Sequence, residues 1–253
     1  MPRFFVAPEA VSEEYITVTE GDYNHIRNVL RMHIGESLTV CDGEGTDYRC
    51  EVNDYENGVC RLRILAREDS AVELPVAITL YQGLPKKDKM ELIVQKAVEL
   101  GAARIVPVVC KRTIVKIEDQ KREERKTERL RAIAESAAKQ SGRGIVPEVS
   151  SPVSFKEAIK AAATECKVIL LPYENALGMK ETREALAAAV SSGSVGIFIG
   201  PEGGFERSEV ELANEAGARI ISLGRRILRT ETAGLTALSA LMLLTEEASE
   251  DNR

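Results

Sequence analysis

Residues 196–234 read GIFIGPEGGFERSEVELANEAGARIISLGRRILRTETAG. The apolar run 196–199 predicts a buried β-strand, and the glycine-rich turn 200–205 connects this strand to a helix. A second apolar strand, 219–222, leads through another loop into a long helix. A third strand runs into the segment LLPYENALG (170–178). In an open parallel sheet, ligands bind at the carboxyl ends of the strands, so we expect these three loops to form one pocket.

The glycine-rich turn lacks the features of a phosphate-binding loop. It has neither the Lys-Ser/Thr pair of a P-loop nor the G-x-G-x-x-G pattern of dinucleotide sites. Glu202 adds a carboxylate that would repel a pyrophosphate, so the turn suits a neutral or cationic ligand. Taken alone, the turn is equally consistent with a structural connection into a helix, capped by a capping box of Ser208 and Glu211.

The pattern of predicted secondary structure changes near residue 76. Residues 76–253 alternate apolar strands with helical patterns, and the strands are continuous apolar runs, as in a parallel sheet covered on both faces. Residues 1–70 contain short β-branched and aromatic runs separated by turn residues. We therefore predict an α/β domain over 76–253 and a small β-barrel over 1–70, interrupted by one helix that begins at Asp22.

The composition excludes several classes of protein. The most apolar helix, near the end of the chain, is too short and too rich in Ser and Thr to span a bilayer, and the first residues do not resemble a signal peptide. Five cysteines form no C-x-x-C pair, and the chain has only two histidines. We therefore expect a cytoplasmic protein with reduced thiols and no metal. The net charge of −6 argues mildly against nucleic acid, but local basic clusters can still bind polyanions.

Five segments together resemble a known family. They are IGPEGGF (199–205), SLG…ILRTETA (222–233), LPYE (171–174), GLPKKDKMELIVQKAVELG (83–101) and AAKQSGR (137–143). Their order and content are similar to the RsmE family of SPOUT methyltransferases, which methylate N3 of one uridine in bacterial 16S ribosomal RNA with S-adenosylmethionine (AdoMet). The resemblance covers most of the chain. It implies a parallel sheet with a C-terminal trefoil knot and an N-terminal PUA-like barrel.

The resemblance also implies site residues. Those expected to line the AdoMet pocket are Leu171, Gly200, Glu202, Gly203, Leu223, Gly224, Leu228, Thr232 and Ala233. N3 of uracil bears a proton, so methyl transfer requires removal of that proton and stabilisation of negative charge on O2 and O4. Arg229 is the candidate for charge stabilisation. The proton acceptor is either Glu231 or solvent, because a carboxylate at a helix N-terminus also has a simpler role facing the helix dipole.

RNA contacts are expected from basic and polar side chains: Arg27, Arg31, Lys86, Lys89, Gln140 and Arg143. Arg27 and Arg31 are four residues apart, so a continuous helix would place them on one face. The expected partner is 16S rRNA, within the assembled small subunit.

We also expect a homodimer. SPOUT pockets are usually completed by a partner chain, and the helix containing TAGLTALSALMLL (232–244) is apolar on several faces.

Two alternative functions remain open. One is a SPOUT enzyme that acts at another RNA site, such as a ribose 2′-OH, although LRTETA differs from an Asn-rich motif. The other is an RNA-binding protein without catalytic activity, against which the intact loops argue.

Overall fold

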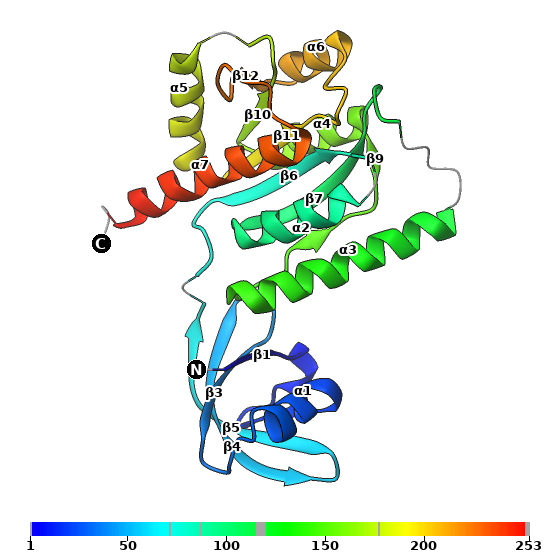
Figure 1. The fold of residues 1–253 in the computed structure, drawn as a ribbon. Coiled ribbons are helices and arrows are strands. Elements are labelled where there is room, and N and C mark those ends of the chain that lie inside the picture. Colours follow the sequence, from blue (N-terminus) through cyan, green and yellow to red (C-terminus); the bar gives the residue numbers. More distant parts are fainter. Residues whose placement is uncertain (1, 71, 87, 115–119, 177, 251–253) are drawn as a thin grey trace. The chain divides into compact units, whose positions relative to one another are not determined.

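A computed structural model describes residues 2–70, 72–86, 88–114, 120–176 and 178–250. The chain divides into two compact units (Figure 1). Unit 1 comprises Met1–Glu73 and Ala138–Val146, and unit 2 comprises Leu74–Ala137 and Pro147–Arg253. This division differs from the expected 1–70 and 76–253 because the segment after residue 137 returns to the first unit.

Unit 1 is a five-stranded sheet in the order β1-β3-β4-β5-β2, with β1 and β2 at its edges. In the described residues of this unit, β1 and β3 pair in parallel and the other neighbouring strands pair antiparallel. The strands are β1 (Arg3–Phe5), β2 (Tyr15–Val18), β3 (Ser37–Cys41), β4 (Thr46–Glu56) and β5 (Val59–Asp69), and a short 3₁₀ turn, η1, covers Pro8–Ala10. Asn57 and Gly58 both have positive φ at the turn between β4 and β5, which is the Asn-Gly pattern of a tight hairpin.

The helix of unit 1 differs from the prediction. It begins as α1 (Glu20–Asn24), with Thr19 rather than Asp22 at the N-cap, and continues as a π-helical turn, η2 (His25–Val29). The N–H of Leu30 donates to the carbonyl of His25, five residues back, and the helix then ends. Arg31 lies beyond this end with a φ of 55°. Arg27 and Arg31 therefore do not share a helix face, because the wide turn ends the regular spacing between them.

Unit 2 contains a parallel sheet in the order β12-β10-β11-β6-β7-β8, with β9 also paired to β7. The strands are β6 (Ala77–Gly83), β7 (Ala102–Val109), β8 (Glu148–Val149), β9 (Val153–Ser154), β10 (Val168–Pro172), β11 (Ser194–Ile199) and β12 (Arg219–Ile221). The helices are α2 (Lys89–Glu99), α3 (Gln120–Ser141), α4 (Phe155–Glu165), α5 (Met179–Val190), α6 (Arg207–Glu215) and α7 (Thr230–Glu250). The predicted parallel α/β sheet is confirmed.

Helices pack against the sheet in two groups. α7 contacts α2, α5 and β11, whereas α4 contacts α6, β7 and β9 (Figure 1). An aromatic cluster fills the core on the α4 side. In it, Tyr81 stacks on Phe198 with ring centroids 4.4 Å apart, and Phe155 contacts both Phe198 and Phe205. Phe205 belongs to the glycine-rich turn, so this core anchors that turn at the end of β11.

No helix in the described part of the chain combines the length and apolar character that a membrane crossing needs. The five cysteines are unpaired thiols. Burial raises the pKa of Cys50 and of Cys110 to about 12, so both thiols are protonated near neutral pH. Among the described residues, no group of three or more His, Cys, Asp or Glu side chains is placed to hold a metal ion.

Candidate active site

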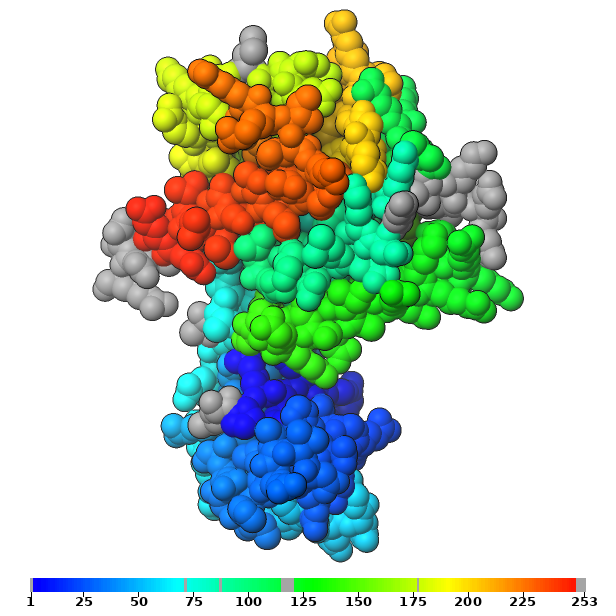
Figure 2. All heavy atoms as spheres, viewed as in Figure 1, coloured from blue at the N-terminus to red at the C-terminus, as the bar shows by residue number. Residues whose placement is uncertain are grey.

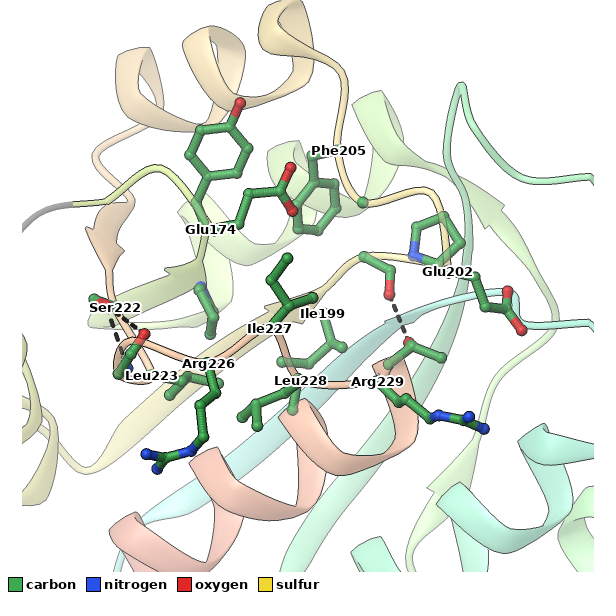
Figure 3. Close-up of a pocket in the computed structure, with 18 of the residues that line it drawn as sticks. Glu174, Ile199, Glu202, Phe205, Ser222, Leu223, Arg226, Ile227, Leu228 and Arg229 are labelled. Atoms are coloured by element: carbon green, nitrogen blue, oxygen red, sulfur yellow. Dashed lines mark hydrogen bonds between the residues drawn. The ribbon is translucent and has the colours of Figure 1, made fainter.

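A pocket of about 420 Å³ lies at the carboxyl ends of β10, β11 and β12 (Figure 3). Three segments supply most of its lining: 172–174 at the end of β10, residues of 199–205 after β11, and 222–230 leading into α7. Lys89 of α2 and Ala233 of α7 complete it. The last segment, orange in Figure 2, lies at the surface of unit 2. The structure thus brings together the three loops whose convergence the sequence predicts.

Six of the nine residues expected to hold AdoMet line this pocket: Gly200, Glu202, Leu223, Gly224, Leu228 and Ala233. Leu171 is instead fully buried in the aromatic core, because alternate residues of β10 point to opposite faces of the sheet. Gly203 faces Arg112, whose Cβ would lie 3.0 Å from an added Cβ. Thr232 is exposed on α7 and is not among the lining residues.

Sequence reasoning missed several lining residues. They are Pro172, Tyr173, Glu174, Ile199, Pro201, Gly204, Phe205, Ser222, Arg225, Arg226, Ile227 and Thr230. Ile227 is the most informative, since its side chain is 90% exposed yet points into the pocket, toward Glu174 and Ile199 (Figure 3). An isoleucine next to two arginines in a loop is a signal that could have suggested a ligand contact.

A hydrogen-bond relay joins the glycine-rich turn to the start of α7. The hydroxyl of Thr230 donates to the carbonyl of Gly200 at 2.6 Å. The same hydroxyl accepts from the side-chain amide of Gln82 at 2.9 Å. Gln82 is completely buried and also donates to the carbonyl of Gly83. The side chain of Gln82, on β6, therefore connects the start of α7 to the glycine-rich turn through the hydroxyl of Thr230.

A second set of contacts supports the outer side of the same turn. Arg112 donates to the carbonyl of Gly203 at 2.9 Å and to the carboxylate of Glu206 at 2.7 Å. Glu206 is the N-cap residue of α6, and its N–H donates to Glu209. The predicted capping box of Ser208 and Glu211 is therefore wrong, because α6 begins two residues earlier than that pair requires.

Lys89 lines one end of the pocket and lies between two carboxylates, Glu202 in the lining and Glu231 behind it in α7. Its Nζ is 3.1 Å from Glu202 and 3.2 Å from Glu231. The backbone N–H of Lys86 also donates to Glu202. Burial alone would raise the pKa of Glu202, but backbone N–H groups and the Lys89 ammonium outweigh burial and leave the pKa below its ordinary value. The adjacent carboxylates of Glu202 and Glu231 in turn raise the pKa of Lys89.

Arg229 is an exposed residue that lines the pocket near Glu202 (Figure 3). No carboxylate of the described residues lies within ion-pair distance of its guanidinium. Arg225 and Arg226 are also exposed and line the pocket. The segment before α7 thus gives the pocket a basic rim, which suits an anionic partner.

The basic residues expected to contact RNA in unit 1 have different environments. Arg27 lies over the ring of Tyr55, 4.6 Å from its centroid, and Arg31 and Gln140 are exposed. Arg143 is buried and ion-paired with Glu73, which also accepts from the N–H groups of Gly144 and Ile145. The expectation that a loop presents Arg143 to RNA is therefore wrong, because the guanidinium neutralises a partly buried carboxylate within the unit.

Comparisons with known proteins agree with this geometry. The RNA methyltransferase domain family matches residues 72–242, and the RNA methyltransferase PUA domain family matches residues 18–64. The chain is 36% identical to ribosomal RNA small subunit methyltransferase E of Bacillus subtilis (strain 168), over 97% of this chain and 98% of the relative. Identity to the protein of the same name from Synechocystis sp. is 33%, over 96% of this chain and 78% of the relative.

Solved structures are similar as well. Ribosomal RNA small subunit methyltransferase E from Neisseria gonorrhoeae, bound to S-adenosyl methionine, superposes with a TM-score of 0.81 at 34% identity, over 96% of this chain and 98% of that chain. A methyltransferase from Legionella pneumophila in complex with the same cofactor gives a TM-score of 0.78 at 31% identity, covering 96% and 97% of the two chains.

Proposed function

Because this chain belongs to the ribosomal RNA small subunit methyltransferase E family, we propose that its pocket at the ends of β10, β11 and β12 holds AdoMet beside a uridine of 16S rRNA. The protein is an AdoMet-dependent rRNA methyltransferase that modifies N3 of that uridine. The observation that carries the assignment to this pocket is the convergence of three loops around a cavity without a phosphate-binding lysine loop.

The lining of the pocket fits AdoMet. The apolar side chains of Leu223, Ile227 and Leu228 suit an adenine ring, and backbone groups of Gly200 and Gly224 leave room for close approach. The carboxylates of Glu174 and Glu202 complement a positive charge. When bound, AdoMet supplies a methyl group activated by its sulfonium.

Arg229 is the residue to which we assign the main catalytic role. The uracil N3 loses its proton to solvent, attacks the methyl carbon and keeps the new bond, while the electron pair of the C–S bond remains on sulfur. Negative charge develops on O2 and O4 before the transfer, and a fixed guanidinium lowers the energy of that state. Arg229 suits this role because no described carboxylate already neutralises it. Glu231 is engaged by Lys89, so we assign it an electrostatic role rather than that of the base.

Unit 1 supplies a second surface for RNA. Arg27 and Arg31 are interleaved with the exposed apolar residues Val29, Leu30 and Ile34, of which Ile34 is 67% exposed. Arginines that meet phosphates and apolar side chains that contact unstacked bases are typical of single-stranded RNA binding. We assign RNA binding to this surface and to Gln140, and in unit 2 to Lys86 together with the basic rim.

A homodimer and a cytoplasmic location complete the proposal. α2 and α7 contact each other and expose Leu92, Leu243 and Leu244, of which Leu243 is 62% exposed. Exposed leucines on adjacent helices favour a protein interface. The trefoil knot implied by the family belongs to the same proposal, and so does action on the assembled small subunit in the cytoplasm.

The experiment that tests the function is mass mapping of 16S rRNA from a deletion strain, with and without the restored gene. We expect one N3-methyluridine to disappear and return. A lost ribose methyl group would instead favour the alternative of a SPOUT enzyme acting at a 2′-OH. An unchanged methylation map, together with AdoMet binding to the purified protein, would favour a binding protein without catalytic activity.

A further inference from the structure

Three charged side chains from three separate elements meet beside one end of the pocket, and two of them, Lys89 and Glu202, line it. Lys89 is the first residue of α2, Glu202 belongs to the glycine-rich turn, and Glu231 lies in the first turn of α7. The side chains of Lys89, Glu202 and Glu231 are 30%, 28% and 17% exposed. They are therefore shielded enough for their charges to interact more strongly than those of a pair in open solvent.

One ammonium offsets two carboxylates in this cluster. Among the described residues, Lys89 is the only cationic side chain within ion-pair distance of Glu202 or Glu231. Glu202 also accepts from the backbone N–H of Lys86, which carries no net charge. Arg229 lines the same pocket but pairs with neither carboxylate. Within the described residues, no second cationic side chain therefore replaces Lys89 if its charge is removed.

We propose that Lys89 is a positioning residue for methyl transfer, which holds Glu202 and Glu231 together and offsets their charge, so that they do not repel the uracil anion. This inference rests on the proposed function of the pocket. Without the ammonium, two carboxylates that share one small region would face each other. Like charges so placed repel, and one of the two carboxyl groups would take up a proton more readily. The turn and the start of α7 would also lose the ion pairs that connect them.

The test compares Lys89→Met with Lys96→Met as a matched control. Lys96 lies on the same helix but pairs with Glu99, which is not among the pocket-lining residues. Single-turnover methylation of small subunits gives the rate, and calorimetry gives the affinity for AdoMet. We expect Lys89→Met to lower the rate about tenfold, which corresponds to about 1.4 kcal/mol. AdoMet affinity should not fall in parallel, because the extra negative charge attracts a sulfonium. The control should match wild type in both measurements.

Rescue experiments separate charge compensation from simple packing. Lys89→Arg should retain the rate, since a guanidinium can also bridge two carboxylates. Adding Glu231→Gln to Lys89→Met should restore most of the rate by removing one of the facing charges. The rate of Lys89→Met relative to wild type should also rise as the pH is lowered from about 8 to about 6, because one carboxyl group then becomes protonated.

Two outcomes would overturn the inference while wild type binds AdoMet and methylates RNA. One is a Lys89→Met rate within about twofold of wild type. The other is a slow Lys89→Met enzyme that neither Glu231→Gln nor lower pH restores, which would show that Lys89 only packs, or that Glu231 is itself the base. A wild-type protein that fails to bind AdoMet would overturn the proposed function itself, and the inference with it.

Discussion

At the scale of single residues, two exposed arginines near the glycine-rich turn, Arg229 and Arg112, differ in their contacts. Arg229 is close to Glu202 yet free of ion pairs among the described residues, whereas Arg112 is committed to Gly203 and Glu206. The first arrangement leaves a guanidinium ready to stabilise a new charge. The second fixes the backbone of a loop, so substitution of these two arginines should have different kinetic consequences.

Arg229→Ala should lower the single-turnover methylation rate by about 10²–10³, the usual effect of losing one preorganised charge-stabilising group. AdoMet affinity should be nearly unchanged, because the guanidinium acts on the uracil anion rather than on the cofactor. Arg207→Ala is the matched control, since Arg207 is an exposed arginine of α6 that pairs, within the described part of the chain, with Glu211 and lies outside the pocket lining. A rate for Arg229→Ala within twofold of wild type would refute the assignment.

Gly204→Ala tests the backbone of the glycine-rich turn. Gly204 lines the pocket with a φ of 66°, and an added Cβ would lie 3.2 Å from the carboxylate of Glu174. Forcing a side chain into this backbone region costs about 1–2 kcal/mol. Displacing Glu174 should weaken AdoMet binding about tenfold in calorimetry, which corresponds to about 1.4 kcal/mol.

Gly217→Ala is the control for this substitution. Gly217 also has a positive φ, 87°, but has open space around it and lies outside the pocket lining. It should lower the stability in urea without changing AdoMet affinity. Equal affinities for the two variants would show that Gly204 has no part in the binding site.

At the scale of elements, the pocket depends on how β6 supports the loops above it. Gln82 is near the end of β6, and Thr230 starts α7. Their buried hydrogen bond and the partly buried bond from Thr230 to Gly200 together connect strand, turn and helix. The alignment of the three loops therefore depends on a polar contact under the pocket as much as on apolar packing.

Thr230→Val should lower the free energy of unfolding by about 1–3 kcal/mol, because it removes one hydrogen bond of the buried Gln82 amide and the hydroxyl that donates to the Gly200 carbonyl. Thr230→Ser keeps the hydroxyl and should lose much less stability. Urea denaturation followed by circular dichroism measures the difference. If both variants were equally stable, the relay would contribute nothing beyond the volume of the side chain.

At the scale of the whole molecule, the exposed leucines of α2 and α7 form the surface to which we assign the proposed homodimer. Leu92, Leu243 and Leu244 are exposed although they lie on helices that otherwise pack against the sheet. The sequence of α7 also indicates more apolar side chains than one buried face needs, since this helix is apolar on more than one face. In the proposed homodimer, a second copy of the chain covers these leucines.

Leu243→Glu with Leu244→Glu should convert a dimer into a monomer in sedimentation equilibrium at micromolar concentration. The fold should survive because both side chains are exposed, and burying two carboxylates in an interface is costly. Lys180→Glu, on the exposed side of α5, is the control and should leave the association unchanged. A wild-type protein that is monomeric and fully active would contradict the dimer.

The sequence by itself determined the class of fold and the position of the pocket along the chain. Buried parallel strands must be continuous apolar runs, and their carboxyl ends must meet at one edge of the sheet, so the three loops were predictable from local pattern. The family resemblance added the chemistry, and six of the nine proposed cofactor residues line the pocket.

Only the tertiary structure decided which way individual side chains point and which distant groups they meet. Leu171 belongs to the right strand but points into the core. Arg143 has the right charge but pairs with Glu73, and Lys89 meets carboxylates more than a hundred residues away. The physical reason is that ion pairs and side-chain direction depend on packing between remote segments, whereas strand and helix patterns depend on neighbours in the sequence.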